Sequence, residues 1–414
     1  MNEEKLDTEE VDNIEESHKS KLRGISELSI DAIHGITHIV ESLHGVIQSK
    51  FLVSDKKTSE NTTQGITGFI YKNIRYMTSL VGSGIDKILE KIESLVASDK
   101  STNKISYSRE ALIAALNGVL GDHLLARKNP LAIKMQFRFH GQDLTEDQVQ
   151  EQIKSSNGKV LLMIHGLCMN DLQWTKLDHN HGEELAKELG YAPIYLHYNS
   201  GLHVSENGQQ LSGLLERIYQ TSELKIELNI LAHSMGGLLV RSACEEARLD
   251  KKEWLPCLKR VVFIGTPHHG AHLERLGNWV DSILSLSQYT KPFSKLGKIR
   301  SSGITDLRYG NLLESDWDHE DRFEPTGDQR SPVPLQKDIE YYAIAAANKK
   351  TNTANDGKLG DGLVNINSAF GRHKKPEFDL KLNKANLFII DETSHMQLLS
   401  CNNVYTKIRE WFTN

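Results

Sequence analysis

The sequence has little of several features that mark particular classes of protein. Its four cysteines show no C-x-x-C spacing, which argues against a zinc ribbon or a disulfide framework. The formal net charge of −6 provides no general attraction for nucleic acid, and we expect no nucleic-acid partner. The N-terminal stretch MNEEKLDTEEVDNIEESHKSK lacks a basic segment leading into an apolar one, so it does not resemble a secretory signal peptide. We therefore expect a cytoplasmic or membrane-peripheral protein with free thiols.

The first hundred residues also lack an apolar run long enough to cross a bilayer, although they hold two amphipathic patterns. Residues 1–22 are charged and poor in apolar groups, a composition typical of a disordered tail. Within 23–104, apolar residues recur at helical spacing over 25–51 and again over 66–96, with charged residues between them. We predict a helical hairpin that packs on itself or on the main domain. The alternative is a helix pair that lies on a membrane or binds a partner.

Residues 105–414 alternate between helical and strand patterns. The helical stretch SREALIAALNGVLGDHLL precedes an alternation of apolar residues from Leu131 to Phe139, which is typical of a half-buried strand. Short apolar runs follow, four of them separated by helical segments, and this predicts a mostly parallel sheet covered on both faces. The runs are GKVLLMIHG (158–166), APIYLHY (192–198), IELNILAHS (226–234), LKRVVFIGTP (258–267), IEYYAIAAA (339–347) and KANLFIID (384–391).

The segment LNILAHSMGGLLVRSACEEA places an apolar strand, a sharp turn at Ser234 and a helix in immediate succession. A serine at a strained strand-to-helix turn is a nucleophile elbow, and it needs small residues two positions away on either side. Ala232 and Gly236 occupy those positions, so Ala replaces the first Gly of G-x-S-x-G without loss of the small size. Ser234 is therefore the predicted nucleophile.

The strand pattern of VLLMIHGLCMND ends at His165-Gly166, upstream of the elbow. In hydrolases with a nucleophile elbow, the loop after the corresponding strand supplies one oxyanion donor, and the residue after the nucleophile supplies the other. The predicted donors are the backbone N–H groups of Leu167 and Met235. Each such donor stabilises the oxyanion by about 3 to 4 kcal/mol in the transition state.

In hydrolases with a nucleophile elbow, the acid and then the base follow the nucleophile along the chain. Asp361 lies in the Gly-flanked loop of GDGLVNINSA, and His395 lies after the strand KANLFIID. We predict that His395 is the general base and that Asp361 orients it. Asp356 and Asp391 are the alternatives for the acid. His373, in a basic loop with no strand directly before it, is the alternative for the base.

As an ordered set, the strings IHGL, AHSMGG, IGTPHHGA, DGLV and SHMQLL resemble the α/β-hydrolase lipases and esterases over about residues 125–412. The resemblance is greatest to the branch of GPI inositol-deacylase-like hydrolases and bacterial triacylglycerol lipases. It implies that His268 and His269 line the active-site pocket together with His165 and Gly166. It also raises the idea of a structural zinc site at His268, His269 and His272, but without nearby carboxylates we expect no metal.

An insertion of about seventy residues separates two of the predicted strands, and we expect residues 271–338 to form a cap or lid. Its apolar residues would line an acyl pocket; they include Trp279, Ile283, Leu284 and Leu286. The sequence therefore predicts an α/β-hydrolase that cleaves lipid or other acyl esters without a cofactor. The alternatives are an acyltransferase, thioesterase or amidase with the same triad, or a non-catalytic binding protein on this scaffold.

Overall fold

A computed structural model describes the main domain of the chain. The described residues are 107–270, 282, 284, 290–291, 301–318, 328–350 and 360–413. The predicted tail at 1–22 and the predicted hairpin within 23–104 lie outside them. The central sheet belongs to one compact unit, which comprises residues 113–290 and 298–414.

An eight-stranded sheet forms the centre of this unit, with the strand order β2-β1-β4-β3-β5-β6-β7-β8. The six strands from β4 to β8 in that order pair in parallel, whereas β1 pairs antiparallel with both β2 and β4. The predicted mostly parallel sheet is thus confirmed. The strands are β1 (Gln136–Phe139), β2 (Gln142–Asp143), β3 (Lys159–Ile164), β4 (Ala192–His197), β5 (Glu227–His233), β6 (Leu258–Ile264), β7 (Glu340–Ala346) and β8 (Leu387–Ile390).

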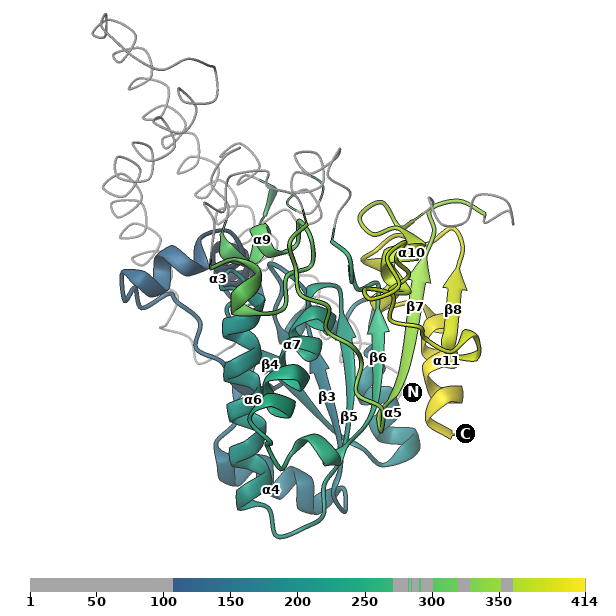
Figure 1. The fold of residues 1–414 in the computed structure, drawn as a ribbon. Helices are drawn as coiled ribbons and strands as arrows, with labels where there is room; N and C mark the ends of the chain where they lie inside the picture. Colours follow the sequence, from purple (N-terminus) through teal and green to yellow (C-terminus); the bar gives the residue numbers. More distant parts are fainter. Residues whose placement is uncertain are drawn as a thin grey trace, which may run out of the picture. The chain divides into compact units, whose positions relative to one another are not determined.

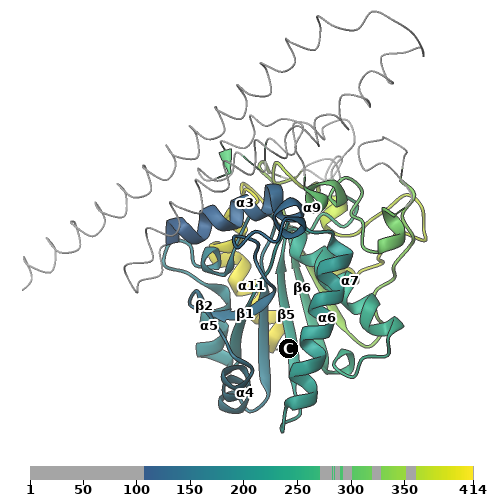
Figure 2. The same ribbon diagram turned by 90° about the vertical axis from the view of Figure 1, so that its left-hand side faces the viewer.

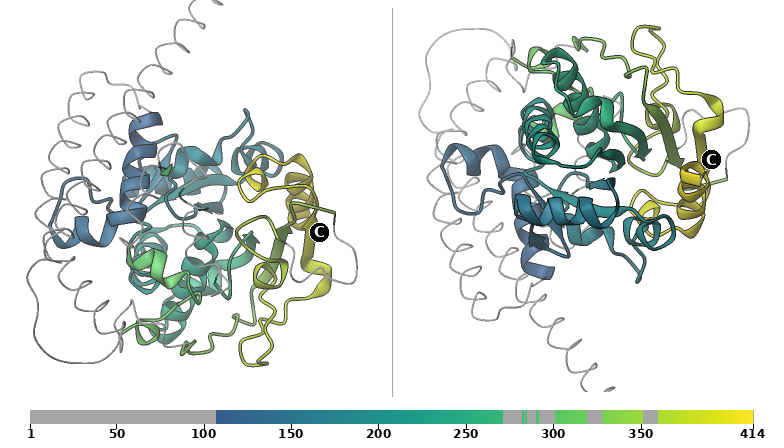
Figure 3. Two further views of the ribbon diagram at one scale, coloured as in Figure 1. Left: turned by 90° about the horizontal axis from the view of Figure 1, so that it is seen from above. Right: turned by 90° about the horizontal axis from the view of Figure 1, so that it is seen from below.

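Helices cover both faces of the sheet (Figures 1 and 2): α6 and α7 lie on one face, and α5 and α11 lie on the other. Figure 3 shows the same layers from above and from below. The helices are α3 (Tyr107–Ala126), α4 (Glu146–Ser155), α5 (His181–Leu189), α6 (Val204–Thr221), α7 (Met235–Leu249), α9 (Ser302–Asp306), α10 (Ile366–Ala369) and α11 (Asn402–Thr413).

The core is made by the two-sided burial of the central strands. In β5 every residue after Glu227 is buried, and β3 is buried after Lys159. Such continuous burial is the pattern of a parallel sheet with helices on both faces. One large apolar cluster joins strand residues to side chains of α11, among them Leu161, Met163, Leu231, Val262, Ile344, Ile408 and Trp411. Because parallel strands share one direction, their carboxyl ends meet at a single edge, where binding sites of such sheets form.

The first predicted strand is shorter than the alternation of apolar residues suggested, because β1 begins only at Gln136. The preceding backbone instead bonds to one buried side chain of α3. Asn117 Nδ2 donates to the Leu131 carbonyl at 2.8 Å, and its Oδ1 accepts from the Ile133 amide at 2.9 Å. These two bonds take the backbone groups that a strand partner would otherwise use.

The described parts of the predicted cap are held against the main domain by side chains. The Ser301 hydroxyl donates to the Gly118 carbonyl at 2.6 Å, and the Ser302 amide and hydroxyl both reach Asp122 Oδ2. Leu284 is buried, while Trp279, Ile283 and Leu286 lie outside the described residues. Within the described ranges, no helix is both long enough and apolar enough to cross a membrane.

Candidate active site

Ser234 sits between the last residue of β5 and the first residue of α7, with backbone angles of φ +54° and ψ −124°. A positive φ at a non-glycine residue is strained, and it is the backbone feature of a nucleophile elbow. The Ser234 amide donates to the Ile264 carbonyl at 2.9 Å, which ties the turn to β6. A Cβ at position 236 would lie 2.6 Å from the Ile164 carbonyl oxygen, so only glycine fits there. With the sheet order, this elbow defines the α/β-hydrolase fold.

Asp361 and His395, 34 residues apart, meet as a buried pair. His395 Nδ1 lies 2.6 Å from Asp361 Oδ2, and both side chains are almost wholly excluded from solvent. The other carboxylate oxygen, Oδ1, accepts from the Leu363 and Val364 amides at 2.9 and 2.8 Å, which fixes the carboxylate in place. An Nδ1–H donated to Asp361 leaves Nε2 of the neutral ring as a proton acceptor. That buried Nε2 has no hydrogen-bond partner among the described residues.

Neighbouring side chains hold the His395 loop from several directions. His233 Nε2 donates to the His395 carbonyl at 3.3 Å, and burial holds the pKa of His233 well below its usual value. Lys176 Nζ donates to the Met396 carbonyl at 3.1 Å, and His181 Nε2 donates to the Leu398 carbonyl at 2.9 Å. These contacts could not be predicted from the sequence, because each joins segments more than 160 residues apart and leaves no local pattern.

Gly265, the first glycine of the GTPHHG string, borders the His395 ring. Gly265 follows β6 with φ +62°, and a Cβ there would lie 3.0 Å from His395 Cε1. The ring of His395 therefore occupies the space that a side chain at position 265 would fill. This explains why a glycine follows the strand at this point.

The predicted oxyanion donors lie at the ends of neighbouring strands. Leu167 follows β3 in the segment after His165-Gly166, and Met235 is the first residue of α7. Within the described part of the chain, neither backbone N–H donates to an acceptor. By contrast, the Cys168 amide donates to Ser200 Oγ at 3.0 Å. A helix N-terminus at Met235 further favours developing negative charge near Ser234.

Ser234 and His395 line one pocket, whose described wall is largely apolar. The lining residues are Leu167, Cys168, Met169, Gln173, His233, Ser234, Thr290, Leu363, His395 and Met396. No Lys, Arg, Asp or Glu occurs among them. The described wall therefore offers no charged partner to a bound acyl group.

The four residues predicted in the pocket wall are not among these lining residues. His165 and His268 are completely buried, and the His268 ring packs edge-on against Phe263 at 4.6 Å. Gly166 lies directly behind Ser234, since a Cβ there would be 2.9 Å from Ser234 Cβ. His269 lies beside His373, with ring centroids 4.8 Å apart.

The alternatives for the acid and the base lie elsewhere or outside the described residues. His395 Nδ1 bonds to Asp361 rather than Asp391, and Asp356 lies outside the described residues. His373 Nδ1 accepts from the Lys375 amide at 3.2 Å. The structure thus brings together His395 and Asp361.

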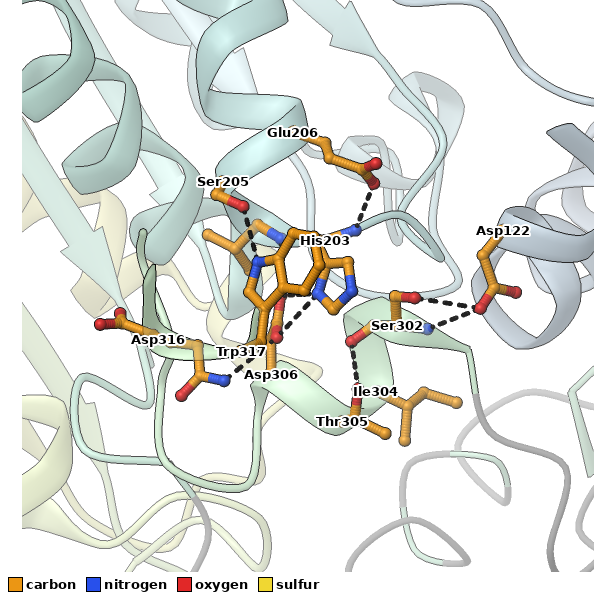
Figure 4. A network of polar contacts seen from close by, with 12 residues as sticks. Asp122, His203, Ser205, Glu206, Ser302, Ile304, Thr305, Asp306, Asp316 and Trp317 are labelled. Carbon is orange, nitrogen blue, oxygen red and sulfur yellow. Dashed lines mark hydrogen bonds and ion pairs between the residues drawn. The ribbon is translucent and has the colours of Figure 1, made fainter. Parts of the chain in front are cut away.

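A second polar network links the start of α6 to segment 301–318 (Figure 4). His203 Nδ1 lies 3.0 and 3.1 Å from the two oxygens of Asp306, whose Oδ2 also accepts from the Val204 amide at 2.8 Å. The Trp317 indole stacks on the His203 ring at 3.7 Å with an interplanar angle of 1°. Its Nε1 donates to Ser205 Oγ at 3.0 Å. This network fastens the cap segment 301–318 to the start of α6.

Among the described residues, no group of three or more His, Cys, Asp or Glu side chains lies close enough to hold a metal ion. His272, which belongs to the histidine cluster of the sequence, lies outside those residues.

Comparison with known proteins gives few matches of sequence and several of structure. A domain family of unknown function, DUF7379, matches residues 127–306. No curated protein matches the chain. Among solved structures, the mature lipase BlEst2 of Bacillus licheniformis is 20% identical, with 62% of this chain and 92% of that chain covered and a TM-score of 0.40.

Two further solved structures are similar at lower identity. An esterase of Thermogutta terrifontis is 14% identical, with 69% of this chain and 95% of that chain covered and a TM-score of 0.36. The phospholipase PlaB of Legionella pneumophila, in complex with thio-NAD, is 13% identical, with 51% and 44% covered and a TM-score of 0.31. At such values a likeness carries no argument about reaction or substrate. The assignment of the fold rests on the sheet order and the elbow.

Proposed function

We propose that the chain is a serine hydrolase that cleaves carboxylic esters through an acyl-enzyme. One observation carries the proposal. A buried His395–Asp361 pair, joined at 2.6 Å, leaves His395 Nε2 without a hydrogen-bond partner among the described residues, and His395 lines the pocket that also holds Ser234 on its strained turn. A nucleophile, a base and a carboxylate that orients the base are the parts that acyl transfer requires.

In the proposed reaction, His395 Nε2 takes the proton of the Ser234 hydroxyl while Oγ attacks the ester carbonyl carbon. The carbonyl π electrons move to oxygen, and the N–H groups of Leu167 and Met235 stabilise the oxyanion. Collapse of this intermediate breaks the bond to the alcohol, which leaves with the proton from His395. A water molecule, deprotonated in turn by His395, then releases the acyl group as a carboxylic acid and restores Ser234. No step requires a cofactor.

The apolar wall of the pocket supports a neutral acyl group, such as that of a lipid ester. Leu167, Met169, Leu363 and Met396 contribute side chains without charge, and an acyl chain gains from leaving water against such a surface. The same features suit the lipase branches that the sequence resembles. Contact with a membrane through the amphipathic helices predicted within residues 23–104 belongs to this proposal as a route to lipid substrates.

An acyltransferase, thioesterase or amidase would use the same residues, and these reactions differ only in leaving group and acceptor. A non-catalytic binding protein would not require the unpartnered Nε2 beside Ser234. Substrate profiling with matched esters, thioesters and amides separates the first group, and covalent labelling separates the second.

The first test is incubation of the full chain with a fluorophosphonate probe, followed by peptide mass mapping. Attack of Ser234 Oγ on phosphorus displaces fluoride and leaves a stable adduct. We expect labelling at Ser234 that disappears in His395→Ala. His373→Ala is the matched control, because it removes a histidine from a nearby loop and should leave labelling unchanged.

Absence of labelling in a folded sample, with and without detergent to open a lid, would contradict the proposal. Labelling at another serine would move the nucleophile away from Ser234. Labelling at Ser234 without turnover of any ester, thioester or amide would favour the binding protein.

A further inference from the structure

The segment after β4 runs beside the predicted oxyanion loop, because β4 and β3 are parallel neighbours in register. Ile164 pairs with Leu196, so the residues that follow each strand lie next to one another at the sheet edge. Tyr198 and Ser200 belong to this segment, and both are 1% exposed. Neither has a part in the proposed chemistry.

Both side chains hold the loop of residues 165–168. The Tyr198 hydroxyl donates to the His165 carbonyl at 2.8 Å, and its ring stacks on the His165 ring at 4.4 Å. Ser200 Oγ accepts from the Cys168 amide at 3.0 Å. Leu167, the predicted oxyanion donor, lies between these two anchor points.

The Cys168 end of the loop is the strained one. Cys168 has φ +60°, a left-handed conformation that non-glycine residues seldom adopt and that surrounding contacts must maintain. Helix α3 presses on it from the other side, since a Cβ at Gly118 would lie 2.8 Å from Cys168 Cα. The Ser200 hydroxyl is the polar group that holds the Cys168 amide in this position.

The segment that carries Ser200 is itself anchored. Asn199 Nδ2 donates to the Gly121 carbonyl at 3.0 Å, and Asn199 Oδ1 accepts from the Gly201 amide at 3.0 Å. Asn207 on α6 donates to the Asn199 carbonyl at 2.9 Å. Ser200 therefore acts from a fixed position on the loop that it holds.

We infer that Ser200, assisted by Tyr198, is a positioning residue that aims the Leu167 amide at the oxyanion of the proposed reaction. Because Ser200 takes up the Cys168 amide, the Leu167 amide, which has no acceptor among the described residues, is left as the available donor of this loop. Preorganised donors are effective because no reorganisation is needed as the charge develops. This inference rests on the proposed function, and it assigns to the β4–α6 segment a share of transition-state stabilisation.

The test compares Ser200→Ala with the wild-type chain on a p-nitrophenyl ester of a short fatty acid. Loss of one oxyanion donor costs roughly 10²–10³-fold in kcat, so a misaimed donor should cost roughly ten- to a hundredfold. KM should change by less than about twofold, because the ground-state carbonyl makes little use of the donor. The inhibition constant of an alkyl trifluoromethyl ketone, which forms a tetrahedral oxyanion on the serine, should rise by the same factor as kcat falls.

Ser212→Ala is the matched control. Ser212 is also a buried hydroxyl acceptor, for Trp254 Nε1 at 3.2 Å, but it lies on α6 and does not line the pocket. It should lower the melting temperature without changing kcat or the inhibition constant. Tyr198→Phe keeps the ring stacked on His165 and removes only the hydroxyl, so it tests the other anchor if Ser200→Ala does not fold; we expect a loss in kcat of roughly threefold to tenfold.

An unchanged kcat and inhibition constant in a folded Ser200→Ala or Tyr198→Phe protein would overturn the inference and leave the proposed function intact. A rise in KM alone would also overturn it, because it would point to the shape of the pocket. If the wild-type chain hydrolyses no ester and takes up no fluorophosphonate, the proposed function and the inference both fail.

Discussion

Among the described residues, two buried histidine–aspartate pairs are joined by short hydrogen bonds and look alike at first sight. In one, His395 Nδ1 lies 2.6 Å from Asp361; in the other, His203 Nδ1 lies 3.0 and 3.1 Å from the oxygens of Asp306. Burial raises the pKa of Asp306, against the opposing effect of His203. A histidine held by a carboxylate is therefore not in itself a sign of catalysis.

The serine near each pair and the surroundings of each ring make the difference. Ser234 occupies a strained turn and lines a pocket, whereas Ser205 lies in the first turn of α6 and its hydroxyl accepts from the Trp317 indole. Trp317 also covers one face of the His203 ring (Figure 4). At the candidate active site, His395 Nε2 has no hydrogen-bond partner among the described residues, and Ser234 and His395 line the same pocket. The second pair anchors segment 301–318 to the start of α6.

Replacing the serine near each pair with alanine should give the greatest difference in activity between the two sites. Ser234→Ala should lower ester hydrolysis by a factor of about 10⁴ or more, because the acyl-enzyme cannot form. Ser205→Ala should leave kcat within about twofold, since its hydroxyl only accepts from Trp317. Initial rates with a short-chain ester, together with circular dichroism spectra, measure this. Comparable losses in both variants would erase the distinction between the two sites.

Substitution of the aspartate in each pair should also have different effects on catalysis and on stability. Asp361→Asn should lower kcat by about 10⁴, because an amide no longer selects the histidine tautomer with a basic Nε2. Asp306→Asn should leave kcat nearly unchanged and lower the melting temperature, because His203 and the Val204 amide lose their carboxylate. Steady-state kinetics and thermal unfolding of both variants provide the measurement. A mild effect of Asp361→Asn on kcat would move the acid to Asp356 or Asp391.

Substitution of Trp317 tests whether the His203–Asp306 network stabilises the folded protein. Trp317→Leu removes the stacked ring and the hydrogen bond to Ser205, and we expect a loss of about 2 to 3 kcal/mol in the free energy of unfolding. Trp317→Phe keeps an aromatic ring and should lose less. Urea denaturation monitored by circular dichroism gives both values. If the wild-type chain, Trp317→Leu and Trp317→Phe had equal free energies of unfolding, this network would not act as an anchor.

Much of the fold and the centre of the site follow from local sequence patterns. The strands of the parallel sheet, the turn at Ser234 and the order Ser234, Asp361, His395 are set by apolar runs and by small residues within a few positions of one another. The Gly-flanked loop after the strand IEYYAIAAA pointed to Asp361 as the acid, and His395 Nδ1 bonds to Asp361.

Other features depend on contacts between distant segments, which leave no local pattern. Asp306 lies 103 residues from His203, inside a segment that the sequence presents only as a cap. Likewise, the string GTPHHG does not reveal that His268 is completely buried rather than exposed at the pocket. Such placements are decided by how the loops pack over the strand ends.

His181 represents a third kind of buried histidine, one without a carboxylate partner, and we expect it to affect the pH dependence of stability. His181 is completely buried and bonded to the Leu398 carbonyl, and burial lowers its pKa from 6.5 to about 4. The unfolded chain thus binds a proton on this residue between about pH 6.5 and pH 4, where the folded chain does not. Stability must fall as the pH is lowered through that window, by at most about 3 kcal/mol from this group.

His181→Gln retains a donor for the Leu398 carbonyl but does not titrate. The loss of unfolding free energy between pH 7 and pH 4.5 should therefore be smaller in this variant than in the wild-type chain. His140→Gln is the control, because the His140 side chain is 60% exposed and its replacement should leave the pH dependence as it is. An unaltered slope in His181→Gln would mean that this histidine takes up a proton without unfolding.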